Sequence, residues 1–147
     1  MPDAWLESLP QDRCLELLRE QNVGRIAILV QGEPMILPVN YRLAEPPSGP
    51  FLAIRTRPGN VIDQAPEDVA FEIDSIDPLH HRGWAVLVRG ELVHASAPSA
   101  NSRAYVDSEP WIARDRDAWL FIEPFAITGR ELHAAESEWV FRRGEYL

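Results

Sequence analysis

The sequence predicts a mainly β fold, a six-stranded antiparallel barrel with flanking helices. Short runs of β-branched and aliphatic residues recur along the chain, and turn signals separate them. Proline makes up 13 of the 147 residues, above its usual share of about 5%, which suits short strands joined by ordered loops. Closure into a barrel removes the strand edges that an open sheet exposes, and an open α+β sheet is the alternative.

Length and composition predict one domain over residues 1–147, large enough for a core without disulfides. The net charge of −9 argues against nucleic acid as a partner, because phosphate neutralisation needs a basic face. Apolar runs such as 26–30 and 84–88 are far shorter than the roughly 20 residues of a membrane-spanning helix. With no secretory signal in view, we expect a cytoplasmic protein that uses neither a membrane nor nucleic acid.

The first element is a predicted helix. Ser8 and Gln11 have the spacing of a capping box at its start, and Gly24 is expected to end it as a left-handed cap. Three apolar residues share one face at helical spacing, namely Cys14, Leu17 and Leu18. We therefore interpret Cys14 as a buried packing residue.

A β-hairpin follows. Residues 26–30 form its first strand, 31–34 its turn and 35–43 its second strand. Pro38 indicates a strand edge or a bulge, since proline cannot donate to the ladder. Residues 51–56 are predicted as the third strand.

The middle of the chain continues this pattern. A turn and a short helical piece are expected over 57–65, and a fourth strand over 69–76. The fifth strand, 84–95, contains Gly90, which favours a sharp bend or a bulge.

In the last third of the chain, a weak sequence signal predicts a helix over 98–108, and a loop is predicted over 107–117. The sixth strand covers 119–132 and is expected to break at Pro124 and Gly129.

Familiar catalytic motifs are missing, including a nucleophile elbow, a phosphate-binding P-loop and a zinc-protease helix. The acid pairs Glu72/Asp74 and Asp115/Asp117 share strand faces, but solvated carboxylates are the commoner case. The four histidines, His80, His81, His94 and His133, show no metal-ligand spacing. No catalytic side chain and no metal site are predicted.

The unusual stretch is the cationic turn Arg55-Thr56-Arg57-Pro58-Gly59-Asn60, which leaves a strand and enters a short helix. Arginine binds phosphate through two parallel hydrogen bonds, and backbone amides near a helix start also attract it. The alternative is a solvated turn whose arginines pair with Glu45 or Asp63.

Six segments in a fixed order carry a resemblance over nearly the whole chain: CLELLREQNVGRIAI, PVNY (38–41), IRTRPGN (54–60), VAFEID (69–74), GWAVLVRGEL (83–92) and ITGREL (127–132). In this order the sequence resembles the pyridoxamine 5′-phosphate oxidase-like family, and especially its short actinobacterial-type members. The resemblance implies an FMN-binding split barrel, that is, a six-stranded antiparallel barrel that forms a homodimer with FMN in a groove between subunits.

The resemblance also implies which residues meet the flavin ring. The backbone of Val39, Asn40 and Tyr41 would line the isoalloxazine, and Trp84 and Ala85 would lie near it. Members of the family often carry Ser or Gln at the position of Ala85, where a polar group meets the flavin.

The flavin phosphate would lie beside Arg55 and Thr56, and the turn through Asn60 would close over it. Members commonly carry Lys or Arg one residue after Asn60, where this chain has Val61. Loss of such a charge-assisted hydrogen bond costs about 1.5–3 kcal/mol. Arg57 is the candidate substitute for the missing cation.

The function implied is an FMN-dependent oxidoreductase, in which the flavin does the chemistry and the protein supplies binding and orientation. Two alternatives stay open. One is a cofactor-poor dimeric binding protein, and the other is a split barrel that binds a deazaflavin or haem in the same groove.

Overall fold

The structure is a computed structural model that describes residues 5–57, 59, 62 and 68–133. Its elements in chain order are β1 (Trp5–Leu9), α1 (Gln11–Glu20), β2 (Val23–Val30), β3 (Glu33–Ala44), β4 (Phe51–Arg55), β5 (Asp68–Asp77), β6 (Arg82–His94), α2 (Ala100–Ser108), α3 (Pro110–Ala113), the short 3₁₀ helix η2 (Arg116–Ala118) and β7 (Trp119–His133).

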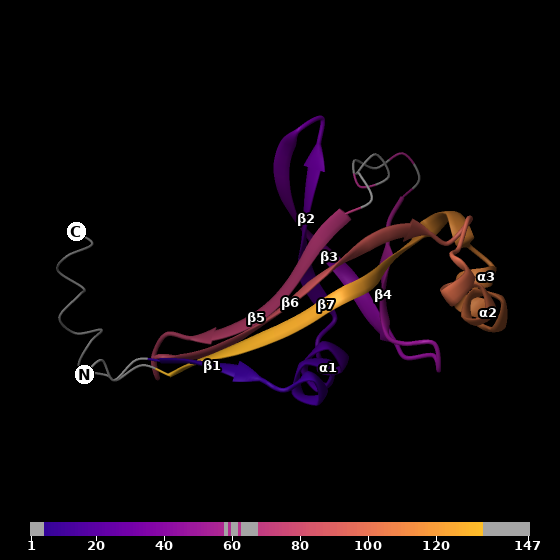
Figure 1. Ribbon diagram of the computed structural model, residues 1–147. Coiled ribbons are helices and arrows are strands. Elements are labelled where there is room, and N and C mark those ends of the chain that lie inside the picture. The colour runs from indigo at the N-terminus through magenta and orange to yellow at the C-terminus, as the bar shows by residue number, and fades with distance from the viewer. Residues whose placement is uncertain (1–4, 58, 60–61, 63–67, 134–147) are drawn as a thin grey trace.

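The strands form one antiparallel sheet in the order β1-β7-β4-β3-β2-β5-β6, and a further pairing of β6 with β7 closes six of them into a barrel (Figure 1). The predicted six-stranded antiparallel barrel with flanking helices is therefore confirmed. The ladder between β2 and β5 is only three residue pairs long, from Arg25 opposite Glu72 to Ala27 opposite Ala70. The short β1 is a seventh strand that the sequence analysis missed, and it pairs with the end of β7.

Helix α1 covers one end of the barrel. Its buried Cys14, Leu17 and Leu18 belong to the same core cluster as Ile26 and Phe71, which point inward from the barrel wall. The interpretation of Cys14 as a packing residue is confirmed, since it is fully buried. Burial raises the pKa of its thiol.

Both expected ends of this helix were wrong. Ser8 lies in β1, opposite Arg130, and the cap position belongs to Pro10, which makes no side-chain capping bond. Gly24 lies within β2 and does not have the positive φ of a left-handed cap. Its lack of a Cβ instead makes room for the ring of Phe71, whose Cζ would lie 2.2 Å from an added Cβ.

The predicted hairpin is confirmed as β2 and β3. A two-residue turn joins them at Gln31 and Gly32, whose φ angles of 53° and 81° suit the right-handed twist of the flanking strands. Pro38 pairs with Arg25 of β2, whereas the pairing of β3 with β4 starts only at Tyr41. Pro38 therefore lies on an edge, as expected.

Gly90 marks a bulge, also as expected. The register between β6 and β7 shifts at Arg89/Gly90, and Phe125 of β7 is left without an opposite residue. The predicted breaks at Pro124 and Gly129 were wrong, because β7 runs through both. Pro124 is tolerated because it lies at the bulge.

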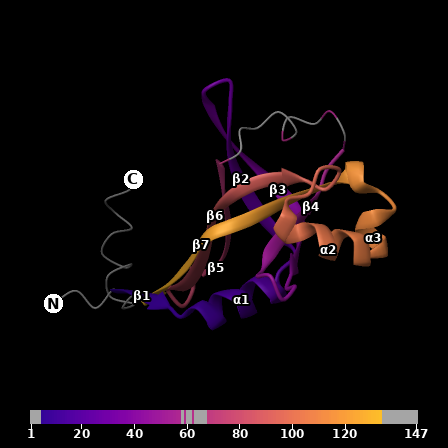
Figure 2. The same ribbon diagram turned by 45° about the vertical axis from the view of Figure 1, so that its right-hand side comes forward.

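Helices α2 and α3 form a second layer beside the barrel (Figure 2). They cover outward-facing residues of β4 and β7, including Phe51 and Phe121, in a separate core cluster. The helix predicted over 98–108 is confirmed as α2, which starts after the capping residue Ser99. The predicted loop over 107–117 was wrong in part, because it contains α3, whose Ile112 is buried.

The helical piece expected over 57–65 lies almost wholly outside the described residues. Among the helices that the structure describes, none has the length and apolarity to cross a membrane.

Candidate functional site

Strands β3 and β4 bring two of the predicted segments together. Tyr41 lies opposite Ile54, so residues 39–41 are beside the start of the cationic turn at Arg55. Arg55 and Arg57 are exposed, whereas Thr56 is buried. The pairing of β3 with β4 thus places an exposed cationic surface beside the outer face of β3.

Arg55 extends from the end of β4 over the ring of Trp119, with its guanidinium carbon 5.5 Å from the ring centre. Its Nη2 lies 3.5 Å from Oδ2 of Asp115, and both side chains are more than half exposed. An exposed ion pair at this distance contributes little, so Arg55 can exchange this carboxylate for another anion.

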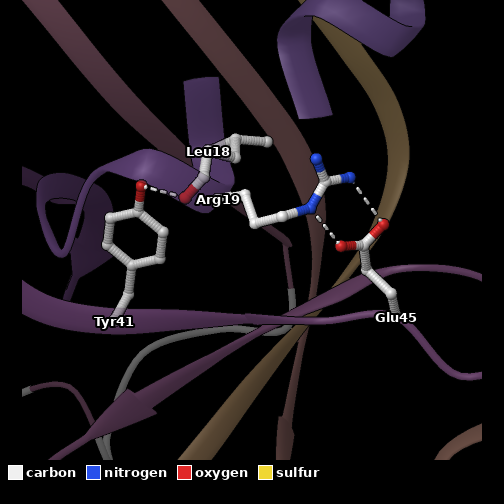
Figure 3. A network of polar contacts seen from close by, with 4 residues as sticks. All are labelled: Leu18, Arg19, Tyr41 and Glu45. Carbon is white, nitrogen blue, oxygen red and sulfur yellow. Dashed lines mark hydrogen bonds and ion pairs between the residues drawn. The ribbon is translucent and has the colours of Figure 1, made fainter. Parts of the chain in front are cut away.

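The expected alternative partner of the turn, Glu45, is engaged elsewhere. Arg19 of α1 donates from Nε and Nη2 to the two oxygens of Glu45 at 2.6 and 3.0 Å (Figure 3). The other expected partner, Asp63, lies outside the described residues, as do Asn60 and Val61. In the described part of the turn, Arg57 makes no ion pair.

Thr56 is held by the elements behind it. Its backbone N–H donates to the carbonyl of Ala118 at 2.8 Å, and its hydroxyl donates to the carbonyl of Arg57 at 3.5 Å. Thr56 therefore fixes the position at which the chain leaves β4.

The three predicted β3 residues divide between two faces. Asn40 is exposed on the outer face, whereas Val39 and Tyr41 pack against the barrel core. The hydroxyl of Tyr41 donates to the carbonyl of Leu18 at 2.7 Å (Figure 3), and burial raises its pKa. Only the backbone of this segment and the Asn40 side chain are available to a ligand outside the barrel.

Trp84 and Ala85 lie apart from the other predicted residues. They belong to β6, opposite Ser75 and Asp74 of β5, and the strands β5 and β2 separate them from β3. One chain alone does not bring the two groups together.

The structure adds an aromatic and cationic arrangement that the sequence analysis missed. Arg42 of β3 lies over the ring of Trp111 at 4.3 Å, and this ring meets Trp119 edge to face at a centroid distance of 4.8 Å. Arg42, Trp111, Trp119 and Arg55 thus form a continuous row, which we call the Arg–Trp row. The only sequence signal is the alternation of Asn40 and Arg42 on one strand face.

The comparison with known protein families decides the relationship. The family model described as pyridoxamine 5′-phosphate oxidase matches residues 10–131. The chain belongs to this family. The resemblance drawn from the sequence motifs is confirmed, and the closed barrel described above is the split barrel of the family.

Three proteins illustrate the similarity of this chain to known sequences and structures. Rv0080, an uncharacterized protein of Mycobacterium tuberculosis, is 30% identical over 82% of each chain. The FAD-binding protein of Mycobacterium smegmatis is 26% identical, with a TM-score of 0.61 over 86% of this chain and 98% of its own. A Corynebacterium glutamicum protein assigned by name to the pyridoxamine 5′-phosphate oxidases is 29% identical, with a TM-score of 0.63 and the same coverage.

Both members of the acid pair Glu72/Asp74 form ion pairs with one arginine, Arg25. Nη2 of Arg25 lies 3.1 Å from Oε1 of Glu72 and 2.6 Å from Oδ2 of Asp74. Desolvation, followed by the hydrogen bond to Asp74, raises the pKa of Glu72. The pair is therefore an ion-paired surface cluster on β5, on the outer face of the barrel.

One group of possible metal ligands lies where β1 meets the end of β7. Glu7 stands opposite Glu131, and Nε2 of His133 lies 3.4 Å from Oε2 of Glu7 and 3.6 Å from Oε2 of Glu131. A cation could be held here by atoms within 4.8 Å of one another. Strand pairing creates this group, so sequence spacing gave no signal.

Two surface hollows lie away from the predicted flavin residues. One, of about 460 Å³, opens between α1, the loop at residues 48–50 and the bulge of β7. The other, of about 490 Å³, lies between residues 46–48 and α2. Neither of these two hollows is lined by Arg55 or by residues 39–41.

Proposed function

We propose that this protein is an FMN-dependent oxidoreductase that binds its flavin on the outer surface of β3 and β4. The observation that carries the proposal is the weakly paired Arg55 beside the exposed Asn40, with Arg57 next to it. The family membership and the FAD-binding relative from M. smegmatis support a flavin as the ligand.

The residues present fit the phosphate of such a cofactor. Arg55 and Arg57 provide forked cations at the end of β4, and Thr56 anchors the chain between them. Asn60 is proposed to close the turn over the phosphate. A guanidinium that replaces a long contact to Asp115 with a bidentate phosphate contact gains a stronger, charge-assisted pair.

The rest of the site orients the flavin. The backbone of Val39, Asn40 and Tyr41 is proposed to line the isoalloxazine ring, held in place by the Tyr41 hydroxyl bond to α1. The flavin, when bound, supplies the electron-transfer chemistry, so no general base from the protein is needed. The protein would bind the cofactor, fix its plane and shield it from water.

A homodimer is proposed to complete the groove. Ile36 is 69% exposed and Leu87 is 39% exposed, both on the outer face of the barrel. They lie on β3 and β6, and a second copy seated on this wall would cover both side chains. A second copy would bring its own Trp84 and Ala85 to the flavin, which explains why one chain leaves these residues apart from Asn40.

If the protein forms the proposed homodimer, Ile36→Glu is expected to lower the mass of the particle that it forms in solution. The wild-type protein is expected to have twice the chain mass at micromolar concentration, because burial of this face outweighs the cost of association. The substituted carboxylate would have to be buried at the interface, so light scattering should show a monomer. Leu79→Glu, on the exposed β5–β6 turn, is the control and should leave the mass unchanged. A wild-type monomer would exclude the groove.

The flavin site predicts that Arg55→Ala weakens FMN binding by about 10- to 100-fold, the equivalent of a lost charge-assisted hydrogen bond. The measurement is a titration of the full chain with FMN, followed by fluorescence quenching. Arg103→Ala is the control, because Arg103 is an exposed arginine on α2, away from β3 and β4, whose Nη2 donates to the carbonyl of Pro98. Equal FMN affinity in wild type and Arg55→Ala would refute the phosphate site.

The visible spectrum of the purified protein tests the competing functions. A flavin gives absorption in the blue, and haem gives an intense Soret band. A colourless protein that ignores FMN would instead support a deazaflavin ligand or a cofactor-poor dimeric binding protein.

A further inference from the structure

We propose that Glu7, Glu131 and His133 form a zinc site that fastens β1 to the end of β7. These three residues belong to the ladder between β1 and β7, and none of them is part of the proposed flavin site. The zinc site and the flavin site can therefore be tested separately, and either can fail without the other.

The strand register brings the three side chains onto one face of the sheet. Glu7 of β1 stands opposite Glu131 of β7, and His133 follows two residues later on β7. Because side chains alternate between the faces of a strand, Glu131 and His133 point to the same side. β1 lies along the end of β7 (Figure 1), so an ion held here would join the first strand of the chain to the last.

The donor atoms are spaced like the ligands of a zinc ion. Nε2 of His133 lies 3.4 Å from Oε2 of Glu7 and 3.6 Å from Oε2 of Glu131. Donors that surround a tetrahedral zinc ion at about 2.0–2.2 Å lie about 3.3–3.6 Å from one another. The third separation, between the two carboxylates, is within 4.8 Å, and the exposed carboxylates can shorten it by rotation.

The charges around the site favour a cation. Like charges directly opposite each other in an antiparallel pair are destabilising, and this chain has a net charge of −9. Arg13 of α1 lies near enough to Glu131 for their charges to interact, but its ion pair is with Glu16. Arg82 of β6 stands opposite His133 and, within the part of the chain that the structure describes, forms no ion pair with either glutamate of the site. A bound cation would remove the repulsion between the two facing glutamates.

The donor set selects a transition metal over calcium or magnesium. An imidazole nitrogen with carboxylate oxygens suits zinc, whereas calcium and magnesium take oxygen ligands. The side chains of Glu7 and Glu131 are 64% and 44% exposed, so the ion can enter directly from solvent. Three protein ligands leave one position of a tetrahedral ion for water.

A cross-link at this place would stabilise the weakest part of the sheet. β1 is only five residues long and is the terminal strand in the sheet order, with β7 as its neighbour. The structure therefore assigns the zinc ion a structural role, in which it holds the start of the chain against the barrel.

The first test is a calorimetric titration of the chelator-treated full chain with zinc chloride. We expect one zinc ion per chain in wild type. Glu7→Gln, Glu131→Gln and His133→Gln should each weaken binding by about 10- to 100-fold, the effect of losing one charge-assisted contact. The three positions are partly exposed, so the variants should keep the wild-type circular dichroism spectrum.

Glu91→Gln is the matched control for the glutamates. Glu91 of β6 also stands opposite a glutamate, Glu123 of β7, but neither has a histidine two residues along its strand. His94→Gln is the control for the imidazole, because His94 is an exposed histidine at the end of β6. Both control variants should bind zinc as wild type does.

The second test asks whether zinc holds β1. Saturating zinc should slow the hydrogen exchange of the backbone amides of residues 5–9 in wild type and in Glu91→Gln, because binding to the paired strands opposes local opening. The same zinc concentration should have no such effect in Glu7→Gln.

Three results would overturn the proposal. The first is a wild-type protein that shows no saturable zinc binding. The second is zinc affinity that is unchanged in Glu7→Gln, which would mean that the ion does not join the two strands. The third is zinc bound without slower exchange in β1, which would mean a surface chelate with no structural role.

Discussion

Replacing Gly90 with alanine is expected to lower the free energy of unfolding by about 3 kcal/mol, at the upper end of the cost of overpacking. A Cβ at this position would lie 2.4 Å from the carbonyl oxygen of Glu123 and 2.9 Å from Cα of Pro124. Both atoms belong to the backbone of β7, so the strand itself must move. The movement would open the bulge at which β6 and β7 close the barrel.

Gly83→Ala is the matched control for this prediction, because it adds the same methyl group to the same strand. Its Cβ would meet Cδ1 of Ile76 at 2.7 Å, the far end of a flexible and exposed side chain. We expect a smaller cost of about 1 kcal/mol, since the close contact is relieved by a rotamer change and the nearest backbone atom, the carbonyl oxygen of Ser75, is 3.2 Å away and needs only a small shift. Chemical denaturation at one protein concentration measures both variants. Equal losses would show that strand closure at Gly90 is not the sensitive step.

Local patterns in the sequence predicted most of the barrel. The strands carry β-branched or aliphatic runs, and a single glycine indicated the bulge at Gly90 because it is the residue that allows close backbone approach. The β2–β3 turn was also predictable, since Gln31 and Gly32 lie between two apolar runs. These features depend on neighbours in the chain.

The errors arose where distant segments decide the local structure. Ser8 has the spacing of a helix cap, but pairing with Arg130 at the end of β7 draws it into β1. Gly24 has the position of a helix-terminating glycine, but the ring of Phe71 requires its small size. Neither Arg130 nor Phe71 is near these positions in sequence, so no local pattern could reveal the contact.

The candidate site also combines features that the sequence predicted with features that contacts between distant segments decide. The family resemblance named residues 39–41 and the turn at Arg55, and the pairing of β3 with β4 does bring them side by side. Strand order separates Ala85 from them within one chain. The stacking of Arg42 on Trp111 depends on how α3 packs against the sheet, so it required the structure.

Phe71→Ala is expected to cost about 3–5 kcal/mol, the usual range for a fully buried phenylalanine. The ring fills the space above Gly24 and meets Tyr41 edge to face at a centroid distance of 4.9 Å. Its loss leaves a cavity between β2, β3 and β5 beneath the segment proposed to line the flavin. Phe125→Ala, at a phenylalanine that is 62% exposed, is the control and should cost less than about 1 kcal/mol.

The contact between Gly24 and the ring of Phe71 allows a further test, in which the two substitutions are combined. Gly24→Ala alone should be destabilising by about 2–3 kcal/mol, because its Cβ would lie 2.2 Å from Cζ of Phe71. In the Phe71→Ala background the ring is absent, and only the carbonyl oxygen of Glu72, 2.9 Å away, still crowds the added methyl group. The double variant should therefore be more stable than the sum of the single losses by at least about 1 kcal/mol. Strict additivity would mean that the backbone at Glu72, rather than the aromatic ring, requires glycine at position 24.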